Sequence, residues 1–178
     1  MILGISTSTY TLLHVVISLI GIGSGLAVMY GMLTADRMDR LTAVFVSFTA
    51  LTSLTGFAFP NDHVTPGIVV GILSLVVLAA LIVARYAMHL RGAWRWIYVV
   101  TASIALYFNC FVLVVQSFEK VPALHALAPT QKEPPFAIAQ LFLLTLFVVL
   151  TVVAVRRFRV GTASLASLSN GARKRDAA

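Results

Sequence analysis

The sequence predicts an all-α membrane protein, a bundle of five transmembrane helices with its N-terminus outside and its C-terminus in the cytoplasm. Of its 178 residues, 60% are hydrophobic and 11% are charged, whereas a soluble domain carries about 25% charged residues. The mean hydropathy is +0.97. Five continuous apolar segments each approach the ~20 residues that a helix needs to cross a bilayer. This composition excludes an ordinary cytosolic enzyme, a disordered protein and a soluble nucleic-acid binder.

The apolar segments define the expected helices. They cover residues 11–33, 41–59, 67–88, 94–118 and 136–155. Strands are excluded because an open sheet edge cannot lie in lipid. No Lys or Arg precedes the first segment, so we expect a retained helix rather than a cleaved signal peptide. Residues 1–155 therefore form the transmembrane domain, and residues 156–178 form a basic cytoplasmic tail that we expect to be disordered.

The positions of the positive charges predict the orientation. All but two of the 13 Lys and Arg residues fall on one side of the predicted bundle, and the exceptions are Lys120 and Lys132. Cytoplasmic loops carry an excess of Lys and Arg, so the N-terminus should lie outside. Arg85 lies near the inner end of its segment, where we expect its side chain to extend to the interface. Trp94, Trp96 and Tyr98 should belong to an aromatic belt at the same level.

The basic tail indicates lipid contact rather than nucleic-acid binding. It contains Arg156, Arg157 and Arg159, followed later by the run Arg173-Lys174-Arg175. We expect each cation to attract anionic lipid by about 1 kcal/mol near the membrane surface. Nucleic acid is not an expected partner, because no folded basic face would position it. A partner membrane protein or another copy of the chain is compatible with so apolar a sequence.

Small residues lie at helical spacing on several predicted helices. Gly21 and Gly25 form a GxxxG motif, and Gly67 and Gly71 repeat the same spacing in the third segment. Small residues four positions apart share one helix face and allow close approach of a second helix. We therefore expect these four glycines to pack against neighbouring helices.

Uncommon polar residues gather in the outer half of the predicted bundle. Asn109 and Gln116 are seven residues apart, so they share one helix face and should point into the bundle, where amides find partners. His14 and Gln140 lie at a similar depth, and His125 lies in the loop over residues 118–135. These five are the candidate ligand-binding residues of an outward-facing polar cleft. Interhelical hydrogen bonding is the alternative role for the amides.

The loop over residues 118–135 is the longest predicted connection, and it contains four of the six prolines. Pro122 suits the first turn of a short interfacial helix, and Pro129 would end that helix. This loop is either a lid over the cleft or a stiff connector.

Several stretches of the chain also resemble a known group of proteins. They include residues 105–116, Lys120-Val121-Pro122-Ala123-Leu124, residues 127–131 and Glu133-Pro134-Pro135-Phe136. With residues 51–57 and 84–86, these stretches look like small uncharacterised multi-pass proteins of bacterial inner membranes. The resemblance implies a bacterial inner-membrane location and brings no activity.

Redox and catalytic chemistry were weighed from the same residues. One outer-leaflet b-type haem could be ligated by His14 with His63 or His125, but His89 has no partner for a second haem. No HxxxH or HExxH spacing supports a metal site. Cys110 is the single cysteine, which excludes an intrachain disulfide and a CxxC mechanism. No Ser or Thr has a His or Lys placed to activate it, so no catalytic residue is predicted.

The expected function is therefore non-catalytic. The chain should bind a lipid-like or quinone-like ligand, or a partner membrane protein, at the outward-facing cleft. The alternatives are a redox protein with one b-type haem or a quinone, and a purely structural or accessory subunit.

Overall fold

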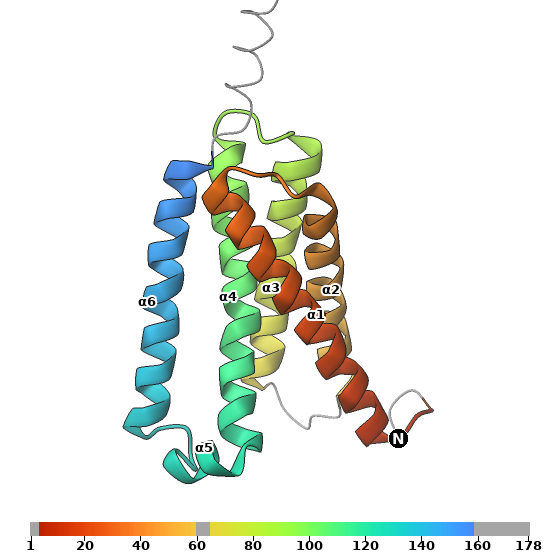
Figure 1. Cartoon of the computed structure of the whole chain (residues 1–178). Helices are drawn as coiled ribbons and strands as arrows, with labels where there is room; N and C mark the ends of the chain where they lie inside the picture. The colour runs from red at the N-terminus through yellow and green to blue at the C-terminus, as the bar shows by residue number, and fades with distance from the viewer. Residues whose placement is uncertain (1–3, 60–64, 159–178) are drawn as a thin grey trace, which may run out of the picture.

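A computed structural model describes residues 4–59 and 65–158 of the chain as an all-helical bundle (Figure 1). Its elements are α1 (Thr7–Thr34), α2 (Asp39–Phe57), α3 (Pro66–Ile82), the π-helical turn η1 (Val83–Ala87), α4 (Trp94–Lys120), α5 (Pro122–Leu127) and α6 (Pro134–Arg157). Five helices are long and apolar enough to cross a membrane: α1, α2, α3 together with η1, α4 and α6. The predicted five-helix architecture is confirmed at this level, as is the short helix in the long loop. Most of the predicted tail lies outside the described residues.

Local sequence explains where the helices begin. Ser6 precedes α1, and its side chain accepts a hydrogen bond from the Thr9 N–H at 3.2 Å. Thr65 has the same role before α3 and is followed by Pro66, which suits a first turn because its missing N–H needs no partner there. Proline also occupies the first turns of α5 and α6.

Helix α4 lies at the centre of the bundle. It packs against α1, α3 and α6, while α1 pairs with α2. Figure 1 shows α6 at one edge beside α4, and α1 crossing the bundle obliquely, so that its N-terminal end diverges from α4. The face of α4 that carries Asn109 points into the bundle over most of its length, since Tyr98, Ala102, Ala105 and Asn109 are all buried.

Three of the four candidate packing glycines lie against other helices. A Cβ added at Gly25 would lie 2.6 Å from Leu106 Cδ1, and one at Gly71 would lie 2.7 Å from the Phe57 ring. A Cβ on Gly21 would lie 3.5 Å from the α2 backbone. Gly67 corrects the expectation: it is exposed, and an added Cβ would meet only the Thr65 side chain of its own segment within 4 Å. Its place in the first turn of α3 is the reason, because α2 has already ended there.

Candidate functional site

His14 joins α1 to α2 near the N-terminal end of α1. Its Nδ1 lies 2.7 Å from Thr55 Oγ1, and its ring meets the Phe59 ring edge-on with centroids 5.3 Å apart. One helical turn earlier, the Tyr10 hydroxyl donates to the Thr55 carbonyl at 2.8 Å. These contacts give the half-buried imidazole a structural role between two helices.

Asn109 joins α4 to α2. Its Nδ2 donates to Thr49 Oγ1 at 2.9 Å, and both residues are buried. An interhelical hydrogen bond of this kind contributes about 0.6–2 kcal/mol to a membrane bundle.

Gln116 and His125 do not face the interior. Both side chains are exposed, so the prediction that Gln116 points into the bundle with Asn109 is wrong. The spacing argument fails because α1 diverges from α4 toward this end (Figure 1). His125 lies on α5, which packs on α4.

Gln140 joins α6 to α4 and leaves one of its atoms unsatisfied. Its Nε2 donates to the Phe111 carbonyl at 3.3 Å. Its Oε1 is buried and has no hydrogen-bond partner among the described residues. The amide orientation is fixed, because a carbonyl oxygen can pair only with the NH₂ side of the amide. The unsatisfied group is therefore an acceptor.

The five candidate residues consequently do not line one polar cleft. His14 and Asn109 bond to α2, Gln140 bonds to α4, and the other two are exposed. For the haem alternative, His14 contacts α2 whereas His125 lies on α5, and His63 lies outside the described residues. Residues 4–59 and 65–158 contain no group of three or more His, Cys, Asp or Glu side chains that could hold a metal ion.

The Glu133 carboxylate connects the residues of the loop before α6. Glu133 accepts hydrogen bonds from the Thr130 hydroxyl at 2.9 Å and from the Lys132 N–H at 3.0 Å. Partial desolvation acts to raise the pKa of Glu133, but these hydrogen bonds outweigh it and hold the pKa below its ordinary value. Gln131 ties the same turn to α4, donating to the Val115 carbonyl at 3.1 Å.

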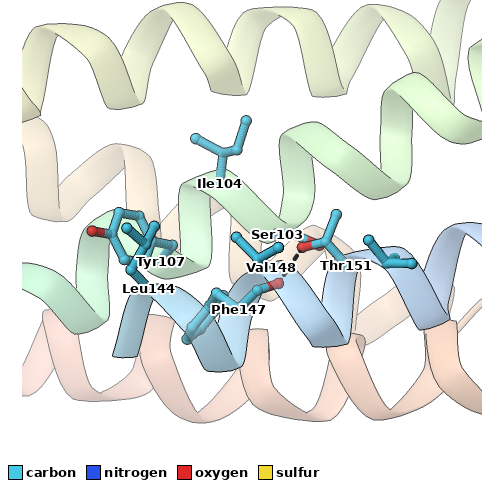
Figure 2. Close-up of a pocket in the computed structure, with 8 residues that line it drawn as sticks. Ser103, Ile104, Tyr107, Leu144, Phe147, Val148 and Thr151 are labelled. Carbon is cyan, nitrogen blue, oxygen red and sulfur yellow. Dashed lines mark hydrogen bonds between the residues drawn. The ribbon is translucent and has the colours of Figure 1, made fainter. Parts of the chain in front are cut away.

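A groove that the sequence analysis missed runs between α4 and α6, with a volume of about 230 Å³. It is lined by Ser103, Ile104, Tyr107, Leu144, Phe147, Val148, Thr151 and Val152 (Figure 2). The Ser103 hydroxyl donates to the Val99 carbonyl, and the Thr151 hydroxyl donates to the Phe147 carbonyl. Because both hydroxyls are used by their own helices, the groove wall presents mainly hydrocarbon.

Unlike Ser103 and Thr151, Tyr107 brings to the groove wall a hydroxyl that is not bonded to its own helix. Its ring lies within a cluster of aromatic side chains, with centroids 5.7 Å from Phe147, 5.9 Å from Phe108 and 6.1 Å from Phe111. Its hydroxyl makes no hydrogen bond to any described residue. Figure 2 shows that hydroxyl pointing away from Thr151, toward the far end of the groove.

The end of the bundle at which α4 begins contains a second polar cluster, which corrects one prediction. Arg85 is 2% exposed and donates from Nη2 to Asp39 Oδ1 at 2.5 Å and to the Arg37 carbonyl at 2.9 Å. Its guanidinium carbon lies 4.9 Å from the centroid of the Tyr98 ring. Arg85 is therefore enclosed by protein and bonded to the loop between α1 and α2. Tyr98 is fully buried, so it does not face lipid as a residue of an aromatic belt would. The π-helical turn that contains Arg85 packs on α4, which carries Tyr98.

Both missed features had a sequence signal. For the groove, the signal was the stripe Gln140, Leu144, Phe147 and Thr151, whose spacing places these residues on one face of α6. For the polar cluster around Arg85, the signal was one arginine inside an apolar segment, with aspartates in a loop on the same side of the predicted bundle. A charge at that depth is expected to be paired.

The interpretation of the site rests on these contacts alone, because comparisons with known proteins do not add to it. A scan against protein-family models, a search of curated proteins and a search of solved structures each found no match.

Proposed function

We propose that this chain is a non-catalytic integral membrane protein that binds a lipid-like or quinone-like molecule. The observation that supports the proposal is the groove between α4 and α6, with its apolar wall and with Gln140 one turn beyond Leu144. The hydrocarbon part of the ligand lies along the groove. The proposed ligand lies at one interface between two helices, rather than in a cleft shared by all five candidate residues.

The size of the groove restricts how a ligand is held. Pockets that enclose a drug-sized ligand have volumes of about 300–1,000 Å³, and this groove has about 230 Å³. It therefore covers one side of a chain-like molecule whose other side remains in lipid. An apolar wall distinguishes poorly between hydrocarbon chains, so selectivity depends on the polar atoms near the groove.

The proposal includes a location and an orientation. The chain lies in a bacterial inner membrane with its N-terminus outside, because within residues 4–59 and 65–158 every Lys and Arg residue other than Lys120 and Lys132 lies toward the end of the bundle where α1 and α6 end. Gln140 lies near the start of α6, so it lies on the outer side. Arg156 and Arg157, in the last turn of α6, contact anionic lipid on the inner side.

Filling the groove tests the proposal. Leu144→Trp places a bulky ring in the groove, whereas Leu141→Trp adds the same ring at an exposed α6 position outside its lining. Overfilling a packed site costs about 1–3 kcal/mol, which corresponds to a loss of about fivefold to 150-fold in ligand affinity. Native mass spectrometry in mild detergent would measure the retained molecule.

We expect the wild-type chain and Leu141→Trp to retain one small molecule and Leu144→Trp to lose it. Equal retention by both variants would contradict a ligand in the groove. A retained second protein in its place would support the partner alternative. A visible spectrum with a Soret band would support the haem alternative on His14.

A further inference from the structure

We propose that the groove ligand is an anionic phospholipid, held with one acyl chain along the groove and with its phosphate at a basic corner where α4 begins and α6 ends. This inference rests on the proposed function and deepens it, because it names the class of the ligand and the direction of its polar part. The basic corner consists of Arg91, Arg95, Arg156 and Arg157.

The groove lies in one half of the bundle. Its lining begins at Tyr107 and Leu144, near the middles of α4 and α6, and extends toward the end where α4 begins and α6 ends. Figure 1 shows these two helix ends at the same end of the bundle. From Leu144 to Arg156 the helix rises about 18 Å, and one leaflet of hydrocarbon is about 15 Å thick. A phospholipid with its phosphate near Arg156 therefore ends its acyl chain at the middle of the bundle, where the lining of the groove also ends.

The walls of the groove continue into the basic corner on both helices. On α6, Arg156 is exposed and lies one turn beyond Val152 of the lining. On α4, Trp96 is 48% exposed and lies two turns before Ser103, so both share one face of the helix. Tryptophan is enriched at the level of the lipid headgroups. A chain in the groove therefore has an arginine and a tryptophan at the headgroup end.

Arg95 holds the basic corner together. Its Nη1 donates to the carbonyl of Phe158, the residue directly after α6. Phe158 is fully buried, and its ring packs on the Tyr98 ring with centroids 5.6 Å apart. These contacts fix the last turn of α6 against the first turns of α4. Arg156 and Arg157 therefore lie beside the start of α4 rather than apart from it.

The positive charge of the basic corner is uncompensated among the described residues. None of its four arginines forms an ion pair with a described residue. The described aspartates at this end, Asp36 and Asp39, lie at the connection from α1 to α2, and Asp39 pairs with Arg37 and Arg85. Cations at a membrane surface attract anionic headgroups. The basic corner therefore favours an anionic phospholipid over a neutral one with the same chains.

Lipid selection by the full-length protein tests the inference. Nanodiscs would contain equal amounts of phosphatidylglycerol, which is anionic, and phosphatidylcholine, which has no net charge, with the same acyl chains. Native mass spectrometry of the released protein would identify the retained lipid. We expect the wild type to prefer phosphatidylglycerol about 25-fold, because two cations near the phosphate each contribute about a factor of five. Arg156→Gln should reduce this preference to about fivefold.

Arg40→Gln is the matched control. Arg40 is also an exposed arginine at this end of the bundle, but it lies on α2, which packs against α1 and α3, so this variant should select lipid like the wild type. Equal retention of the two lipids by the wild type, equal effects of the two arginine variants, or retention of a molecule other than a phospholipid would overturn the inference. If Leu144→Trp still releases the retained molecule in those cases, the proposed function stands. If Leu144→Trp releases nothing, both fail.

Discussion

At the residue scale, the pairing of Arg85 with Asp39 is the least expected contact. The guanidinium is almost fully buried, whereas the Asp39 side chain is 69% exposed. Arg85 Nη1 has no partner among the described residues, so the charge is only partly compensated. The Arg85 guanidinium carbon lies 4.9 Å from the centroid of the Tyr98 ring, and this cation–π contact further stabilises the buried charge. The pair fixes the loop between α1 and α2 to the π-helical turn after α3.

Removing the carboxylate should therefore destabilise the bundle. Asp39→Asn leaves a buried cation without its counter-charge, and because Asp39 itself is exposed, the cost should lie between that of a surface pair and that of a buried pair, about 1–3 kcal/mol. Thermal or SDS unfolding would measure it. Asp36→Asn is the control: Asp36 Oδ1 accepts only from the Met38 N–H at 3.2 Å, a bond that an asparagine oxygen can keep. Equal shifts for the two variants would contradict the role of the pair.

At the element scale, the crossing of α1 with α2 and α4 depends on a missing side chain. An added Cβ at Gly25 would lie 2.6 Å from Leu106 Cδ1 and 2.8 Å from Phe45 ring atoms. These distances are too short for either neighbour to keep its position. The helices approach closely here because residue 25 has no side chain.

Gly25→Ala should therefore destabilise the bundle by about 1–3 kcal/mol through overpacking. Gly23→Ala, two residues earlier on α1, should be neutral or stabilise by up to about 1 kcal/mol, because an added Cβ there meets nothing within 4 Å and alanine is the better helix former. Unfolding of both variants in the same detergent makes the comparison. A Gly25→Ala protein as stable as Gly23→Ala would show that α1 does not cross its neighbours at this residue.

Features that arise within a single helix could be predicted from the sequence, whereas contacts between residues far apart in the sequence could not. The buried face of α4 follows from the period of one helix, so Tyr98, Ala102 and Asn109 could be placed together from sequence. The pairing of Arg85 could not, because Asp39 lies 46 residues away and the π-helical turn changes the helical register. Gln116 was misplaced because periodicity gives a shared face but does not indicate where a neighbouring helix diverges.

At the whole-molecule scale, the outer polar residues are divided between two functions. Asn109 and His14 hold α2 to its neighbours and are satisfied by Thr49 and Thr55. The atoms left without partners, in Tyr107 and Gln140, both lie at the interface of α4 with α6. The sequence signals only the α6 face of the groove, because the groove itself exists only where two helices separated by the long loop are brought together.

Site-specific photo-crosslinking in cells tests the central claim most directly, because it identifies the molecule that lies in the groove. Benzoylphenylalanine would replace Val148, which lines the groove, or Leu141, an exposed α6 residue outside the lining. Mass spectrometry of the adducts would then identify the captured molecules. A ligand in the groove predicts one discrete adduct at position 148 and the ordinary mixture of membrane phospholipids at position 141. The same phospholipid mixture at both positions would contradict the proposed binding site.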